Sequence, residues 1–287
     1  MLNLKFSLIL ATVGRDKDVR NFLSSVFEQE YPLKLVEIIV VDQNDDGRLD
    51  NIITEYADKL CIIHIKSKEK GLSRNRNIGI SKASGDILCF PDDDCRYARD
   101  TLHSVSMSMQ DLSCSLVLGR IWDDCKNCSS FRLWPMKMKV INQWNYYRLT
   151  SSITLFVKNS AGLFFDERFG VGSKYGSNED AIFVYTCIKK KKYTGVYNNK
   201  VVVYHKDQPI DSLPVDKIKS YGYGFGRFIR YYISISSLSL FFLSSSYQLF
   251  KACTSTNSIE RGNRMISLKY RLMGLFREGV KCQKKMD

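Results

Sequence analysis

Runs of apolar residues divide the first 95 residues into alternating segments. Continuous apolar runs rich in β-branched residues cover residues 4–12, 37–42, 61–65 and 86–90, and each has the length of a buried strand. Between them, residues 19–27, 49–60 and 71–81 are typical of helices. Strands that alternate with helices predict an α/β fold with a doubly wound, mostly parallel sheet.

Polar residues follow three of these strands directly, at residues 12–15, 42–46 and 92–94. Ligands of doubly wound sheets bind beyond the carboxyl ends of the strands, where loops and helix N-termini converge. The pattern therefore predicts that these three segments share one ligand-binding edge.

The pattern is less regular beyond residue 115. Residues 115–175 are rich in aromatic side chains, Glu179 and Asp180 begin a helical pattern, and residues 200–205 form a further apolar strand. We interpret residues 1–210 as one α/β domain with halves 1–115 and 116–210. Residues 211–287 no longer alternate between strand and helix patterns, and we expect them to form a helical, basic C-terminal region.

Residues 231–250 contain no charged side chain, and Arg227, Arg230 and Lys251 flank them. Seven of these twenty residues are serine, so the segment is only marginally apolar enough to span a membrane. An amphipathic helix lying against a membrane is the favoured interpretation, and a core helix is the alternative.

The formal net charge of +13 favours anionic partners. Basic residues gather in 189–192 and near the C-terminus, and either a solvated face or a membrane surface explains such runs. The C-terminal group consists of Arg261, Arg264, Lys269, Arg271, Arg277, Lys281, Lys284 and Lys285.

Nine irregularly spaced cysteines in a chain of this size indicate a reducing cytosol. The N-terminal apolar run is too short for a spanning helix and lacks a cleavage site, so we expect no export signal. The expected location is the cytoplasm, including the cytoplasmic face of the inner membrane.

Asp92, Asp93 and Asp94 stand together after the fourth strand. Clustered carboxylates raise one another's pKa unless a cation lies among them, so the trio indicates a Mg²⁺ or Mn²⁺ site. These ions bridge to phosphates, which predicts a diphosphate-linked substrate. A polar loop or helix cap is the alternative.

Three other groups are candidates for chemistry. Residues 70–77 place arginines at a helix start, which suits phosphate or a nucleotide base, or else form an exposed basic turn. Glu179 and Asp180 at a helix start offer a general base, or simply a cap. His205 ends a strand and is a candidate metal ligand or phosphate donor, although a lone histidine is often neither.

The order of these segments resembles the inverting family 2 glycosyltransferases. The resemblance covers residues 4–205 and rests on ATVGR, IIVVDQ, GLSRNRNIGI, GDILCFPDDDC, FDERFGVGSKYGSNED and VVVYH. It implies a GT-A-type fold, a nucleotide diphospho-sugar donor held with Mn²⁺ or Mg²⁺, and single-displacement transfer with inversion. A UDP-sugar is the expected donor. The expected acceptor is a glycan, lipid-linked, in O-antigen or capsule synthesis.

The resemblance also implies roles for the donor side. Thr12 and Arg15 would line the nucleotide pocket, Asp42 would contact the base, and Arg74 would support the base or the diphosphate.

On the reaction side, Asp92 and Asp94 match the outer carboxylates of the family's D-x-D motif, the first near the ribose and the second on the metal. Asp92 and His205 are further candidate metal ligands, and Asp93 stays a candidate because the register is ambiguous. Asp180 would deprotonate the acceptor hydroxyl, with Glu179 as its companion.

Two other classes of function remain as alternatives. A Mg²⁺-dependent phosphohydrolase or nucleotidyltransferase could use the same aspartates, but the first strand ends without the carboxylate that such a phosphohydrolase usually carries there. A basic nucleic-acid or membrane-binding module has no use for the aspartates, and no nucleic-acid motif appears, so no nucleic-acid partner is expected. The Q-x-x-R-W signature of processive synthases is absent, which favours addition of a single sugar.

Overall fold

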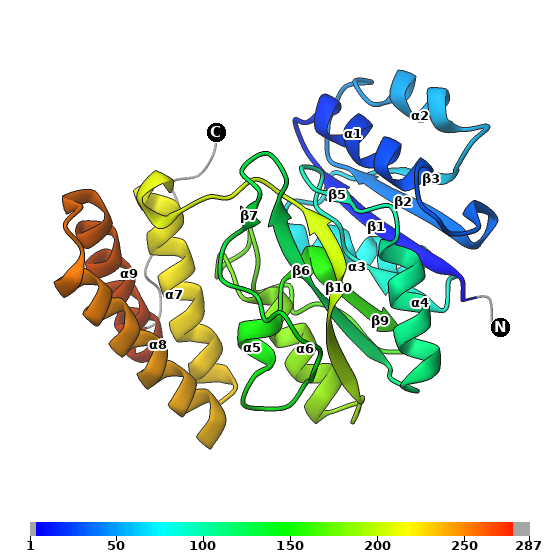
Figure 1. The fold of residues 1–287 in the computed structure, drawn as a ribbon. Helices are drawn as coiled ribbons and strands as arrows, with labels where there is room; N and C mark the ends of the chain where they lie inside the picture. Colours follow the sequence, from blue (N-terminus) through cyan, green and yellow to red (C-terminus); the bar gives the residue numbers. More distant parts are fainter. Residues whose placement is uncertain (1–3, 278–287) are drawn as a thin grey trace.

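The computed structural model describes residues 4–277. Its centre is a ten-stranded sheet in the order β3-β2-β1-β4-β9-β6-β10-β5, with β7 beside β6 and β8 beside β10 (Figure 1). The strands are β1 Phe6–Thr12, β2 Val36–Asp42, β3 Cys61–Lys66, β4 Ile87–Cys89, β5 Arg96–Tyr97, β6 Leu116–Asp123, β7 Cys128–Ser129, β8 Lys139–Val140, β9 Leu155–Lys158 and β10 Gly195–Tyr204.

Most of the sheet runs in one direction. β3, β2, β1 and β4 are mutually parallel. β9 lies antiparallel between β4 and β6, so β6 and its parallel neighbour β10 share the direction of the first four. This confirms the predicted α/β fold. Strands β6 and β9 come from the irregular aromatic segment and were not predicted individually.

Helices surround the sheet and continue beyond it. Around the sheet are α1 Asp16–Phe27, α2 Asp50–Tyr56, α3 Leu72–Lys82, α4 Thr101–Asp111, α5 Tyr146–Leu149 and α6 Glu179–Lys189. The C-terminal part comprises α7 Val215–Tyr231, α8 Ile235–Thr254 and α9 Ser258–Phe276. Short 3₁₀ turns cover Leu33–Leu35, Ser152–Thr154 and Ile210–Ser212.

The register of β1 and β2 places the strand ends together. Every residue of both strands is buried, because the sheet is covered on both faces. Thr12 pairs with Asp42, and Asp42 pairs with Lys66 at the end of β3. The ends of β1 and β2, which the pattern selected, therefore lie along one edge, and Lys66 of β3 lies beside them.

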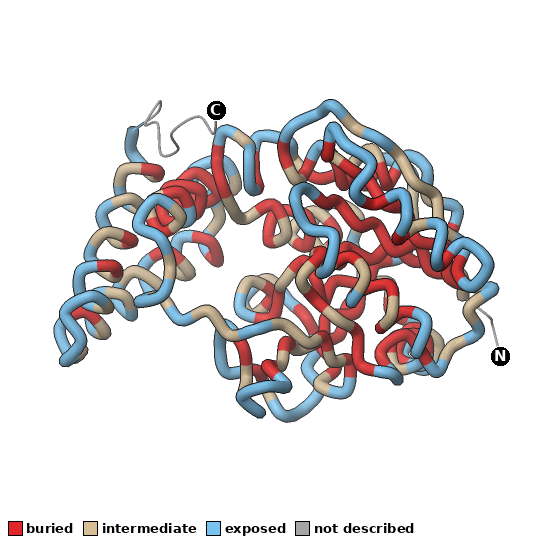
Figure 2. Tube along the Cα trace, turned by 90° about the horizontal axis from the view of Figure 1, so that it is seen from above, coloured by how far each residue is buried: buried red, intermediate tan, exposed pale blue. Residues whose placement is uncertain are grey.

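The C-terminal helices stand beside the sheet (Figure 1). Helix α7 packs on α5 through aromatic side chains. The Tyr147 ring stacks on Phe228 with centroids 5.9 Å apart and meets Phe225 edge-on at 5.4 Å. Figure 2 shows buried residues along the sheet and along α7, whereas α8 and α9 are mostly half-buried or exposed. The helical region predicted after residue 211 is present, but Lys281, Lys284 and Lys285 lie outside the described residues.

Helices α7 and α9 touch at their backbones. A Cβ atom added to Gly226 would lie 2.2 Å from the carbonyl oxygen of Arg271, and one added to Gly274 would lie 2.2 Å from that of Tyr223. Only glycine permits this approach. In the part of the chain that the structure describes, no helix combines the length and the apolar character needed to cross a bilayer.

Candidate active site

The end of β1 is tied to the aspartate loop after β4. The Thr12 hydroxyl donates to Asp93 Oδ2 over 2.7 Å, and the Arg15 guanidinium donates to Asp93 Oδ1 over 3.1 Å and to Asp94. Burial raises the pKa of Asp93 to about 6, although Thr12 and Arg15 act to lower it. The structure thus brings together four residues that the sequence selected from two distant segments.

Arg76 is the buried cation of the site. Its side chain is fully buried, with Nη2 at 2.7 Å from Asp92 Oδ1 and Nη1 at 3.4 Å from Glu179 Oε1. It links two carboxylates that belong to different halves of the domain. The sequence selected the segment that holds Arg76, but it assigned the role to Arg74 and gave none to Arg76.

Arg74 is not brought to the aspartates, although the sequence selected it. Its guanidinium lies at the surface and pairs with Glu69 over 2.7 Å and with Glu167 over 3.2 Å. Two residues turn an α-helix by about 200°, so Arg74 and Arg76 face opposite sides of α3. A signal was available, since Ser73, Arg76 and Ile80 recur at helical spacing on the buried face.

Asp94 and His205 form a pair suited to a divalent cation. Asp94 Oδ1 lies 3.3 Å from His205 Nε2. Two neighbouring ligands of an octahedral ion with bonds of about 2.1 Å stand roughly 3.0 Å apart, so the spacing fits Mn²⁺ or Mg²⁺, for which the Asp94 carboxylate is the typical kind of ligand. Burial tends to raise the pKa of Asp94, but His205 and Arg15 hold it well below its usual range.

The three predicted metal ligands, Asp92, Asp94 and His205, do not form a compact cluster in the described structure. Within residues 4–277, Asp123, Asp124 and Cys125 are the trio of His, Cys, Asp or Glu residues whose ligand atoms all lie within 4.8 Å of one another. Asp92 instead faces Arg76, and Asp94 also faces Arg15. The Asp123 carboxylate accepts hydrogen bonds from the backbone N–H groups of Lys126 and Asp207. Asp123 therefore holds two loops together, which explains its position without a metal ion.

Asp42 lies beneath this edge and is completely buried. Its carboxylate accepts from Lys66 Nζ over 2.8 Å and from the Asn44 backbone over 2.8 Å, and His64 Nε2 lies 3.0 Å away. Burial tends to raise the pKa of Asp42, but Lys66 and the other donors together lower it. Asn44 in turn accepts from the Gly14 backbone over 2.6 Å, which joins the β2 end to the β1 loop.

A glycine loop delivers Glu179 and Asp180 to the aspartates. Gly170 has a φ of +104°, and an added Cβ atom there would lie 2.7 Å from Ser73 Oγ. Ser73 Oγ donates to the Phe169 carbonyl over 2.6 Å, so this loop packs on the start of α3. The chain then enters α6 through Asn178, which is in the left-handed conformation.

The two acidic residues at the start of α6 differ in environment. Burial, followed by the charge of Asp180, raises the pKa of Glu179, while Arg76 opposes the rise. Asp180 is half-buried and opens into a cavity of about 390 Å³. Asp92 and Glu179 line the same cavity.

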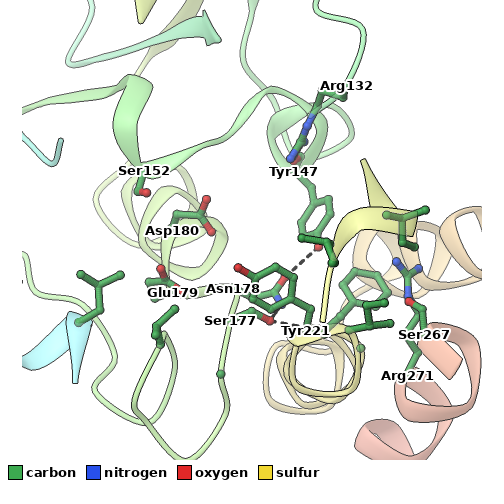
Figure 3. Close-up of a pocket in the computed structure, with 18 of the residues that line it drawn as sticks. Arg132, Tyr147, Ser152, Ser177, Asn178, Glu179, Asp180, Tyr221, Ser267 and Arg271 are labelled. Carbon is green, nitrogen blue, oxygen red and sulfur yellow. Dashed lines mark hydrogen bonds between the residues drawn. The ribbon is translucent and has the colours of Figure 1, made fainter. Parts of the chain in front are cut away.

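The opposite wall of this cavity comes from residues outside the predicted set (Figure 3). The loop after β7 and helix α5 supply Arg132 and Tyr147, and the C-terminal helices supply Tyr221, Phe225 and Arg271. The predicted carboxylates and the C-terminal region thus share one cavity.

Sequence comparison identifies the family. The family model described as glycosyl transferase family 2 matches residues 7–173. The chain belongs to this family. The matched segment holds the β1 end, the β2 end and the aspartate loop. The acidic pair of α6 lies beyond it, at residues 179 and 180.

Several curated family relatives are similar to parts of the chain. The poly(ribitol-phosphate) β-N-acetylglucosaminyltransferase TarS of Staphylococcus aureus is 28% identical over 101 residues, which are 34% of this chain and 18% of TarS. The minor teichoic acid biosynthesis protein GgaB of Bacillus subtilis is 24% identical over 71% of this chain and 23% of GgaB. The chain therefore corresponds to less than a quarter of either relative.

Solved structures share the fold over nearly the whole chain. The mannosyltransferase PcManGT of Pyrobaculum calidifontis, in complex with GDP-Man and Mn²⁺, has a TM-score of 0.65 at 14% identity and covers 97% of this chain and 89% of its own. Residues 1–349 of S. aureus TarS, in complex with UDP-GlcNAc, have a TM-score of 0.60 at 16% identity and cover 95% and 82%. The family 2 chain therefore has the GT-A fold.

Proposed function

We propose that this chain transfers a single sugar from a nucleotide diphospho-sugar to a hydroxyl of a glycan acceptor, with inversion at the sugar carbon. The supporting observation is the shared cavity, into which Asp92 of the aspartate loop and Asp180 of α6 both open. A residue beside the donor and a general base that line the same cavity suit transfer by a single displacement.

The donor side consists of the strand ends. Arg15 would contact the nucleotide, and the buried Thr12 and Asp42 would support the strand ends on which it lies. We propose a UDP-sugar as the donor. A Mn²⁺ or Mg²⁺ ion would be held by Asp94 and His205, with Asp92 beside them. When bound, such an ion supplies positive charge that neutralises the leaving diphosphate.

The acceptor side centres on Asp180. Its carboxylate would take the proton of the acceptor hydroxyl while that oxygen attacks the sugar carbon and the diphosphate departs. Glu179 lies behind it, held by Arg76 at 3.4 Å, and fixes the start of α6. Glu179 would therefore act as a positioning residue, and Asp180 would transfer the proton.

We further propose a lipid-linked acceptor at the cytoplasmic face of the inner membrane, in O-antigen or capsule synthesis. Helix α8 supports the membrane contact, because Phe242, Leu243 and Phe250 are 61–73% exposed. Lys251 follows this apolar face, and Arg261 lies at the start of the next helix. Such a surface suits an anionic bilayer.

The test is a screen of nucleotide-sugars for Mn²⁺-dependent thermal stabilisation, followed by transfer assays with the best donor. UDP-sugars with Mn²⁺ are expected to raise the melting temperature, and EDTA is expected to abolish the rise. Absence of stabilisation by every nucleotide-sugar would contradict the proposal. Release of free sugar without an acceptor would instead support a hydrolase.

A further inference from the structure

Two arginines, Arg132 and Arg271, line the cavity. Arg132 donates to the backbone carbonyls of Tyr147 and Arg148, over 3.2 and 3.1 Å. Arg271 donates to Ser244 Oγ over 2.5 Å and lies over the Phe225 ring at 4.5 Å. Among residues 4–277, neither forms an ion pair with an aspartate or glutamate. Arg76, in contrast, has two carboxylates.

The surroundings of both guanidinium groups favour a bound anion. Burial lowers the pKa of Arg271. Within the described chain, Arg271 Nε is a buried donor with no hydrogen-bond partner. Arg271 is half-buried, and a cation withdrawn from water without a counter-charge is costly, so an anionic group would stabilise it. Arg132 is exposed and adds a second positive charge at the same cavity.

The cavity is polarised from one end to the other. Figure 3 shows Glu179 and Asp180 on one side and Arg132 and Arg271 on the other, with Tyr147 between the two arginines. Burial raises the pKa of Tyr147 to about 12, while Arg271 and Arg132 act to lower it. Asp180 acts to raise the pKa of Tyr147 as well. Tyr221 lies nearer the acidic end, since Glu179 and Asp92 add to the burial that raises its pKa. An occupant that spans the cavity therefore meets the carboxylates with one end and the arginines with the other.

We propose that Arg132 and Arg271 bind a phosphate group of the acceptor, and that the acceptor is a phosphate-bearing glycan carrier. The proposal rests on the proposed function, because it assumes that Asp180 receives the acceptor hydroxyl. Guanidinium groups bind phosphate oxygens in pairs of parallel hydrogen bonds. Two of them, on separate elements, match a dianionic or diphosphate group better than a single carboxylate.

The experiment measures binding of small probes by calorimetry in the presence of saturating UDP and Mn²⁺, which occupy the donor side. Farnesyl diphosphate represents a lipid diphosphate, and glycerol 3-phosphate represents a polyol phosphate. Farnesol, glycerol and glucuronate provide the uncharged and carboxylate counterparts. The variants are R132Q and R271Q, with R99Q as a matched control because Arg99 lies exposed beside Glu30.

At least one phosphate probe is expected to bind, and its affinity should fall about 10-fold or more in R132Q and in R271Q, as for loss of a charge-assisted hydrogen bond. R99Q should bind like the wild type. The farnesyl and glycerol probes distinguish a lipid diphosphate from a polyol phosphate. Arg132 lies in a loop, so the R132Q variant is expected to fold. Its phosphate affinity tests the proposal even where R271Q fails to fold.

Three outcomes would overturn the inference. These are equal binding of farnesol or glycerol, preference for glucuronate over both phosphates, and unchanged phosphate binding in R132Q. Weaker UDP binding in either variant would assign the arginines to the donor instead. Failure of UDP to bind the wild type contradicts the proposed function itself, so the two failures are distinguishable.

Discussion

At the scale of single residues, Asp180 carries the proposed chemistry. Asp180→Asn keeps the shape of the side chain but removes its ability to accept a proton. Transfer is expected to fall about 10²- to 10⁴-fold, as for loss of a general base. The affinity for UDP with Mn²⁺ should stay within about twofold, a change of only a few tenths of a kcal/mol. Transfer kinetics and calorimetry check the two parts, with the exposed Asp111→Asn as control.

Arg74 and Arg76 form a natural pair for comparison. Arg76→Met leaves Asp92 and Glu179 without their shared buried cation, so we expect a loss of about 3–5 kcal/mol of stability and weaker donor binding. Arg74→Met removes only surface ion pairs and should cost at most about 1 kcal/mol. Urea denaturation and UDP titration provide the measurements. Loss of UDP binding in Arg74→Met alone would restore the role first expected for Arg74.

Glu37 predicts a dependence of stability on pH. Burial acts to raise its pKa, but Lys5 at 2.8 Å, Ser7 and Ser84 outweigh it and lower the pKa to about 2. A lowered pKa stabilises the fold above the unfolded value of about 4.5, and this stabilisation is lost as pH falls towards 2.

Between pH 5 and pH 3 the loss from Glu37 is expected to be about 2 kcal/mol. Denaturation curves of wild type and Glu37→Gln at both values check it. The difference between the two proteins should shrink by that amount at pH 3. A difference that stays constant with pH would exclude the role of Glu37.

At the scale of elements, the contact between α7 and α9 positions one wall of the cavity. Gly226→Ala would push α9 away at Arg271, which we expect to cost about 1–3 kcal/mol. The KM for the acceptor should rise while UDP affinity stays unchanged. Gly262→Ala is the control, because an added Cβ atom there meets nothing within 4 Å. An equal KM for the acceptor in both variants would show that α9 does not contribute to the acceptor site.

At the scale of the whole molecule, the outer face of α8 predicts membrane association. Replacing Phe242 and Phe250 with serine removes exposed apolar area without touching the cavity. Binding to anionic phospholipid vesicles is expected to weaken about 10-fold or more, since each aromatic side chain contributes one or more kcal/mol on burial. Co-sedimentation measures this. Unchanged sedimentation, or full activity of a wholly soluble wild type on soluble acceptors, would contradict the membrane contact.

Much of the fold could be predicted because its signals are local. The β1 and β2 runs are buried along their full length, and such runs appear in the sequence as unbroken apolar segments. Thr12, Asp42 and the aspartates 92–94 were found because each interrupts such a run at a strand end. The strands β6 and β9 carry only short apolar runs, LVL at 116–118 and LFV at 155–157, within a segment that is otherwise rich in aromatic and polar residues.

The sequence by itself determined the α/β alternation, the polar ends of the first strands and the order of motifs that identifies the family, because periodicity and motif order are local properties of the chain. Only the tertiary structure decided which arginine of α3 faces inward, since that depends on what packs against the helix. It also joined Arg76 to Glu179 across 103 residues and brought Arg271 to the cavity of Asp180. Contacts of this kind depend on chain folding over long separations, which no local pattern records.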